Sequence, residues 1–208
     1  MQPPLAWQWI NFNISSGAGT ILYLLYEDKP VSREKILRLL DIARFAPSGH
    51  NSQAISYLVV EGPENLMRLS RIVVEWMRET VKLSPEFAKR FNMPVVIREE
   101  EKSGARILRG APHIIVAHAP ADLAAAPVST MLSLEYVELF APALGLGTCW
   151  AGYAMACAQQ FPAFSQFLKI PARRTITGIL MAGYPKYRYH RLPDRNPLDV
   201  AWFETGEV

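Results

Sequence analysis

Three short apolar runs, separated by longer stretches with helical spacing, constrain the fold of this 208-residue chain most strongly. The runs cover residues 57–60, 114–117 and 176–182, and β-branched and other apolar side chains dominate each of them. Short continuous apolar runs are typical of strands buried in a sheet. Because these strands alternate with helices, we expect a layered fold of the α/β or α+β class.

The spacing of apolar residues predicts the helices between these strands. The first begins at Ser32, which we expect to be its N-cap, and ends before the turn that contains Pro47. We expect further helices over residues 64–82, 128–144 and 154–169. We expect Gly145 to end the helix over 128–144 and Pro142 to kink its last turn.

The chain shows no repeat and no low-complexity segment, and its length fits one domain. We therefore expect a single domain over residues 1–208, with an atypical N-terminus at 1–25 and a C-terminal extension at 184–208. Residues 84–110 are charged, contain Pro85 and Pro94, and show patchy helical spacing. This pattern favours a mobile excursion that covers a site, and we interpret the segment as a candidate lid.

Charge and cysteine content exclude several classes of function. With 22 basic and 19 acidic residues the net charge is only +3, too small an excess for a nucleic-acid-binding surface. The spacing of Cys149 and Cys157 fits neither a zinc site nor a redox pair, and the four histidines show no ligand spacing. We therefore expect no metal site. We also expect no membrane span, because the apolar stretch 21–26 is too short to cross a bilayer. The two free cysteines favour a cytoplasmic location.

Three other segments carry groups suited to chemistry. Residues 43–53 pack Ser, His, Asn and Gln side chains into one loop, residues 143–153 combine glycines with aromatics, and residues 183–198 are basic, aromatic and rich in proline. Amide side chains suit the mixed donor and acceptor edge of a flavin, and arginine forks match a phosphate. Taken singly, each segment also fits a structural alternative: a polar turn, a helix C-cap with core aromatics, or a solvated basic tail.

Taken in order, these segments resemble the FMN-dependent nitroreductase family, especially its short members related to ferredoxin-linked nitroreductases. The resemblance covers about residues 26–202 and is most specific at 46–53 (APSGHNSQ), 144–152 (LGLGTCWAG) and 183–185 (GYP) followed by 191–198 (RLPDRNPL). It implies an α+β fold, a three-layer α/β/α sandwich with a mixed sheet flanked by helices. It also implies an intertwined homodimer with FMN held at the subunit interface.

The resemblance further implies the residues of the cofactor site. The loop residues would contact FMN, the backbone around Trp150 would lie near the reactive edge of the ring, and two arginines would hold the phosphate. The implied FMN-binding residues are Pro47, Ser48, Asn51, Gln53, Trp150, Ala151, Gly152, Arg191 and Arg195. No side chain is expected to act as a catalytic acid or base, because a flavin itself carries the redox chemistry.

By the same resemblance, we expect electrons from NADH or NADPH to pass to nitroaromatics, quinones or similar small-molecule acceptors, with ping-pong kinetics. Any ferredoxin partner would be a separate chain, because two cysteines cannot ligate an iron–sulfur cluster within this chain. The alternatives are a specialised flavin enzyme of the same fold, such as a dehydrogenase of modified peptides, a dehalogenase or a flavin-fragmenting enzyme, and a non-catalytic, weakly flavin-binding dimer.

The chain departs from the family pattern at its N-terminus. Families of this type open with an Arg-Arg-Ser-x-Arg stretch that binds the FMN phosphate, whereas residues 20–24 here read TILYL and residues 1–28 contain no Lys or Arg. Two hypotheses explain this difference: a shifted reading frame or misplaced start, and a real divergence that alters cofactor use. An Arg-rich match in another frame of the coding DNA would support the first hypothesis, and its absence from both other frames would exclude it.

Overall fold

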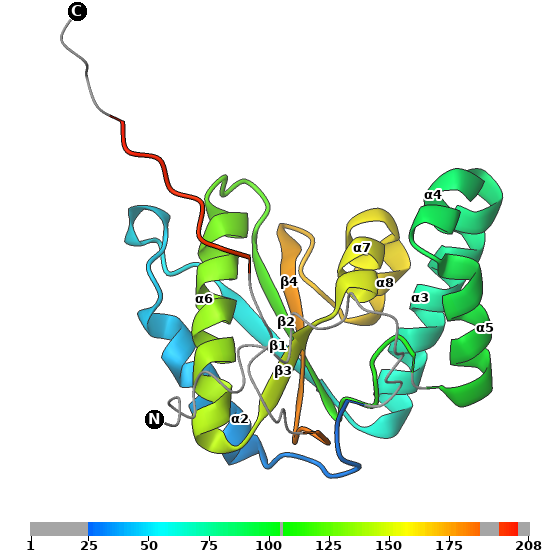
Figure 1. The fold of residues 1–208 in the computed structure, drawn as a ribbon, viewed down its shortest axis with the longest axis horizontal. Helices are drawn as coiled ribbons and strands as arrows, with labels where there is room; N and C mark the ends of the chain where they lie inside the picture. Colours follow the sequence, from blue (N-terminus) through cyan, green and yellow to red (C-terminus); the bar gives the residue numbers. More distant parts are fainter. Residues whose placement is uncertain (1–24, 105, 188–195, 204–208) are drawn as a thin grey trace, which may run out of the picture.

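The structure, a computed structural model, describes residues 25–104, 106–187 and 196–203. Its centre is a four-stranded sheet in the order β1-β2-β4-β3, with helices on both faces (Figure 1). The strands are β1 (Ser56–Glu61), β2 (His113–Pro120), β3 (Gly147–Trp150) and β4 (Arg174–Gly183). The predicted α+β layered arrangement is therefore confirmed for the described part of the chain.

Every neighbouring pair of described strands is antiparallel. The expectation of a mixed sheet is therefore wrong for these residues. The physical reason is that an apolar run indicates where a strand lies but carries no information on its direction. The strand predicted at residues 57–60 is present as part of β1. It lies at an edge, however, and is mostly half-buried rather than buried.

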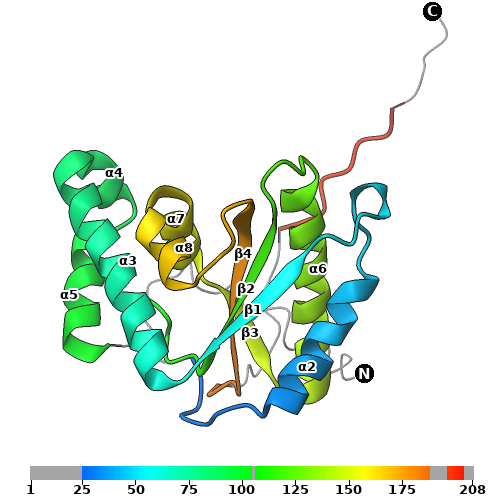
Figure 2. The ribbon, with the colours of Figure 1, turned by 180° about the vertical axis from the view of Figure 1, so that it is seen from behind.

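One face of the sheet is covered by α2 and α6, which lie together in the view from behind (Figure 2). Alternate strand residues such as Ile115 and Leu180, which are register partners, point into this layer. They pack against Leu39 and Leu134. The elements of this face are α2 (Arg33–Asp41), η2 (Ile42–Phe45), α6 (Ala126–Phe140) and η4 (Ala141–Leu144).

The opposite face carries the larger of the two apolar cores. Ile114 and Val116 of β2, and Ile179 and Met181 of β4, alternate with the residues of the first core, as the two-residue period of a strand requires. The helices that cover this face are α3 (Pro63–Leu83), α4 (Pro85–Arg90), α5 (Met93–Ser103), α7 (Gly152–Gln160) and α8 (Pro162–Phe167).

The helix boundaries follow local sequence signals. Ser32 caps α2 as predicted, because its hydroxyl accepts a hydrogen bond from the backbone N–H of Lys35. The expected helix over 154–169 is divided into α7 and α8 at Phe161, since Pro162 cannot continue the hydrogen bonding of α7. Gly145, with a φ of 69°, closes the turn after α6 as expected.

The candidate lid at residues 84–110 forms α4 and α5 rather than an irregular excursion. Ala88, Met93 and Val96 are buried and belong to the larger core, where both helices pack on α3. The segment is thus part of the folded body. That these helices also cover a site stays a prediction.

The structure describes only part of the two chain ends. The atypical N-terminus lies outside the described residues except for Leu25, and so do Arg191 and Arg195. Residues 196–203 extend away from the body without helix or strand (Figure 1). Within the described residues, no helix combines the length and the apolar character needed to cross a bilayer.

Candidate functional site

The polar loop at residues 46–53 is here called the flavin loop, because the resemblance described above implies that it would contact a flavin. It is anchored on the start of α6. The backbone N–H of Gly49 donates to the Ser129 hydroxyl over 3.1 Å. A Cβ atom at Gly49 would lie only 2.4 Å from the Cβ of Ala125, so only glycine allows this close packing. The loop contains the short 3₁₀ turn η3 (Gly49–Asn51).

The flavin loop has an unusual backbone. His50, Asn51 and Gln53 have φ angles of 52°, 51° and 48°, in the left-handed region that non-glycine residues rarely adopt. The Ser48 hydroxyl accepts a hydrogen bond from the N–H of Gln53 over 3.0 Å, as the polar-turn alternative expects. Pro47 and the Asn51 and Gln53 side chains are exposed, and the two amides share a 3.2 Å hydrogen bond.

The second predicted segment forms a corner between β3 and α7. The carboxylate of Glu138, on α6, accepts from the Trp150 indole N–H over 2.7 Å and from the Thr148 hydroxyl over 3.0 Å. Sequence reasoning interpreted residues 145–148 as a turn, whereas strand β3 begins at Gly147 and pairs with β4. Glu138 therefore fixes the orientation of the corner.

The backbone beyond Trp150 is open to a ligand. The N–H of Ala151 is held by the carbonyl of Ile179 over 3.0 Å. Gly152 begins α7, no side chain caps this helix, and a Cβ atom at Gly152 would meet nothing within 4 Å. The first N–H groups of a helix lack partners within the helix, so this corner can donate hydrogen bonds to a bound group.

Both predicted segments pack against α6. Ser129 holds the flavin loop, and the next residue, Thr130, packs over Gly178 of β4 beside the Trp150 ring. A Cβ atom at Gly178 would lie 2.9 Å from the Thr130 methyl group and 3.5 Å from the ring. The structure therefore brings together segments that are about 100 residues apart in the sequence.

Sequence reasoning missed a buried polar stripe on α6. The Tyr57 hydroxyl lies 2.8 Å from the Ser133 hydroxyl, and the Thr130 and Thr177 hydroxyls are 2.7 Å apart. Burial raises the pKa of Tyr57 above its ordinary value. Hydroxyl residues at positions 129, 130 and 133 of a largely apolar helix were the available signal.

The two cysteines are poor nucleophiles. Burial raises the pKa of Cys149 to about 11 and that of Cys157 to about 12, so both thiols stay protonated near neutral pH. Nowhere in the described part of the chain do three or more His, Cys, Asp or Glu side chains gather as a metal site would require.

Comparison with known proteins decides the family. The sequence pattern of the nitroreductase family matches residues 25–184, which is most of the chain. The chain belongs to the nitroreductase family. No curated protein matches it in sequence.

Solved structures show the same fold. An FMN-bound nitroreductase from Bacteroides fragilis is 16% identical with a TM-score of 0.67, covering 99% of this chain and 100% of that one. An FMN-bound nitroreductase from Desulfitobacterium hafniense is 18% identical with a TM-score of 0.69, covering 98% and 100%. A BluB-like flavoprotein from Clostridium difficile is 19% identical with a TM-score of 0.63, covering 86% and 91%.

Proposed function

We propose that this protein is an FMN-dependent NAD(P)H oxidoreductase that reduces nitroaromatics, quinones or similar acceptors with ping-pong kinetics. The observation that carries the proposal is the packing of both the flavin loop and the β3–α7 corner against α6, through Ser129 and Glu138, in a member of the nitroreductase family. The FMN seen in two related structures supports the choice of cofactor.

The described residues fit such a group. Exposed amides at Asn51 and Gln53 offer donors and acceptors, and the open backbone at Gly152 leaves room for a planar ring. Residues held at left-handed φ angles often mark ligand-binding loops. In the proposal, Pro47, Ser48 and these amides line the cofactor, while Trp150 and Ala151 position the corner beside it. FMN would supply the electron-transfer chemistry when bound.

Arg191 and Arg195, proposed to hold the phosphate, lie outside the described residues. Arg195→Ala should raise the dissociation constant for FMN about tenfold to a hundredfold, because a charge-assisted contact is worth roughly 1.5–3 kcal/mol. Arg173→Ala, at an exposed position before β4, is the matched control and should leave FMN affinity unchanged. Equal affinities in the two variants would contradict the assignment of Arg195.

The homodimer is also a proposal, and the outer face of α6 supports it. This helix exposes large apolar side chains, each by at least 36%: Val128, Met131, Leu132, Tyr136 and Leu139. A contiguous apolar face on a central helix is typical of a protein interface. Met131→Glu should convert a dimer into a monomer in analytical ultracentrifugation, whereas Leu83→Glu, at an exposed position on α3, should not.

Steady-state kinetics test the activity. Initial rates with NADH or NADPH against a nitroaromatic and a quinone should give parallel double-reciprocal lines if donor and acceptor use one site in turn. Intersecting lines, or reduced ferredoxin as the only effective donor, would contradict the proposed mechanism.

A weakly flavin-binding, non-catalytic dimer is the second candidate. The observation that favours it is the absence of Lys and Arg from residues 1–28. Losing two or three charge-assisted phosphate contacts could weaken FMN binding by several orders of magnitude. A chain that binds FMN only at millimolar concentration and does not oxidise NADH would support this candidate.

A further inference from the structure

The first residue of β4, Arg174, reaches across β2 to the chain that enters the edge strand β1. Its Nη2 donates to the carbonyl oxygen of His118, on β2, over 2.9 Å. The same nitrogen donates to the carbonyl oxygen of Ala54 over 2.8 Å and to the hydroxyl of Ser56, the first residue of β1, over 3.0 Å. Since β2 lies between β4 and β1, one guanidinium joins the corresponding ends of three neighbouring strands.

This guanidinium also holds one end of the flavin loop. Ala54 directly follows Gln53, the last residue of the loop, and the earlier part of the loop is held where the Gly49 N–H donates to Ser129. Gln53 has a φ of 48°, a conformation that persists in a residue other than glycine only where the surrounding structure fixes it. Arg174 therefore contacts the chain one residue beyond the strained position.

The contact of Arg174 with the loop depends on a histidine. Arg174 Nε donates to Nδ1 of His118 over 2.7 Å. A guanidinium keeps its protons, so Nδ1 can accept only while the imidazole is neutral, with its proton on Nε2. A protonated His118 would place an N–H group and a positive charge against Arg174. Burial, and the charge of Arg174, lower the pKa of His118, so the bond is intact at neutral pH.

No opposite charge within the described residues is placed to offset such a repulsion. The register partners of His118 are Ser56 on β1 and Ile176 on β4, and both are uncharged. Arg174 belongs to none of the ion pairs of the described residues. Protonation of His118 would therefore break the contact with Arg174 rather than modify a neutralised pair.

We propose that Arg174 is a positioning residue that holds the flavin loop in its FMN-binding conformation, and that protonation of His118 releases it. The inference rests on the proposed function, because it assigns the exposed amides of Asn51 and Gln53 to FMN. Acid therefore loosens the loop and weakens FMN binding while the body of the sheet stays folded.

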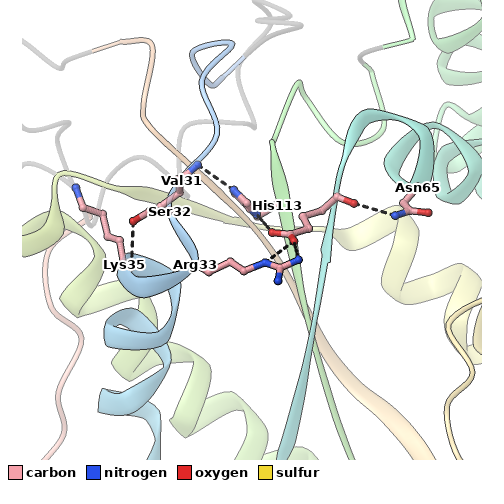
Figure 3. Close-up of polar contacts among 7 residues, drawn as sticks. Val31, Ser32, Arg33, Lys35, Asn65 and His113 are labelled. Carbon is pink, nitrogen blue, oxygen red and sulfur yellow. Dashed lines mark hydrogen bonds and ion pairs between the residues drawn. The ribbon is translucent and has the colours of Figure 1, made fainter.

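His113, at the other end of β2, provides a control for the histidine. Its Nε2 accepts a 3.0 Å hydrogen bond from the backbone N–H of Val31 (Figure 3), and burial lowers its pKa too. No contact of His113 in Figure 3 involves the flavin loop. Titration of His113 should therefore affect the stability of the protein without releasing the loop.

Hydrogen exchange followed by NMR tests the role of Arg174 in the FMN-free full chain. The backbone N–H groups of residues 49 and 51–53 are hydrogen-bonded within the loop or to α6. At pH 7.5, Arg174→Gln should lower their protection factors about tenfold, because it removes hydrogen bonds from a charged donor. Arg173→Gln, at the exposed neighbouring position, should leave them unchanged. Unchanged loop protection in Arg174→Gln would overturn the inference.

The histidine is tested by repeating the measurement at pH 5.5 and pH 7.5. Loop protection in the unsubstituted protein should fall on acidification. His118→Asn keeps an acceptor near the position of Nδ1 but does not titrate, so it should retain protection at both pH values, whereas His113→Asn should behave like the unsubstituted protein. Loss of loop protection in acid that His118→Asn does not prevent would overturn the role of His118. This comparison decides even if Arg174→Gln fails to fold.

FMN titration connects the loop to the cofactor. The ratio of the FMN dissociation constants at pH 5.5 and pH 7.5 should be smaller in His118→Asn than in the unsubstituted protein, a comparison in which the titration of the FMN phosphate cancels. Arg174→Gln should raise the dissociation constant at pH 7.5 about tenfold. Normal FMN affinity in Arg174→Gln would overturn the inference alone. An unsubstituted protein that binds no FMN would contradict the proposed function, and with it the link between the loop and the cofactor.

Discussion

The indole N–H of Trp150 donates a 2.7 Å hydrogen bond to the carboxylate of Glu138. The other oxygen of the same carboxylate accepts from Thr148 over 3.0 Å, so one acidic residue of α6 joins both ends of the short β3 segment. Because the corner after Trp150 is half of the candidate flavin site, Glu138 links the stability of the fold to the geometry of that site.

Glu138→Ala should lower the free energy of unfolding by about 2 kcal/mol, because it leaves a partly buried indole N–H and a buried hydroxyl without their acceptor. Urea denaturation measures this loss. Glu135→Ala, at an exposed position on the same helix, should change stability by no more than about 0.5 kcal/mol. Equal effects of the two substitutions would show that the Glu138 contacts contribute little.

Two glycines should respond in opposite ways to substitution by alanine. Gly49→Ala places a Cβ atom 2.4 Å from that of Ala125, and overpacking should cost about 1–3 kcal/mol of stability. Gly152→Ala meets nothing within 4 Å, so the FMN-free protein should keep its stability while FMN affinity falls. Thermal unfolding and FMN titration of both variants check this. A stable Gly49→Ala protein would contradict the described packing of the flavin loop.

Acid should destabilise the protein through His113, which is buried, and His118, which is half-buried. Burial lowers the pKa of His113, and burial together with Arg174 lowers the pKa of His118. A histidine whose pKa is lower in the folded than in the unfolded state binds fewer protons when folded. The stability that it contributes is therefore present above the unfolded pKa of about 6.5 and is lost as pH falls from there toward the lowered pKa.

The urea concentration at which half of the protein is unfolded should accordingly decrease as the pH is lowered from 7.5 to 5.5. His118→Gln and His113→Gln should each reduce this dependence on pH. A midpoint that rises on acidification, or a slope that both variants leave unchanged, would be inconsistent with these pKa shifts.

Local signals in the sequence predicted most of the helices and three of the strands. Ser32, Pro47 and Gly145 mark the ends of elements through local effects of their own side chains and backbones. These boundaries could therefore be predicted without tertiary structure. β3 was missed because residues 147–150 form a short strand directly after a glycine-containing turn. Its pairing with β4 is a long-range contact that no local pattern reveals.

The segments of the candidate site could be predicted, but not their assembly. Residues 46–53 and 144–152 were recognised from their residue types and order. That both pack against α6, through Ser129 and Glu138, depends on tertiary packing. Glu138 was missed for the same reason, because nothing local distinguishes it from the exposed Glu135. The positions of Arg191 and Arg195 stay predictions.

The visible absorption spectrum of the purified protein, recorded anaerobically before and after addition of FMN and then NADH or NADPH, tests the central claim most directly. The account predicts the bands of a bound oxidised flavin, which bleach with the reduced nicotinamide and return when a quinone or nitroaromatic is added. A protein that takes up no FMN, or one whose bound flavin neither nucleotide bleaches, would contradict the proposed function.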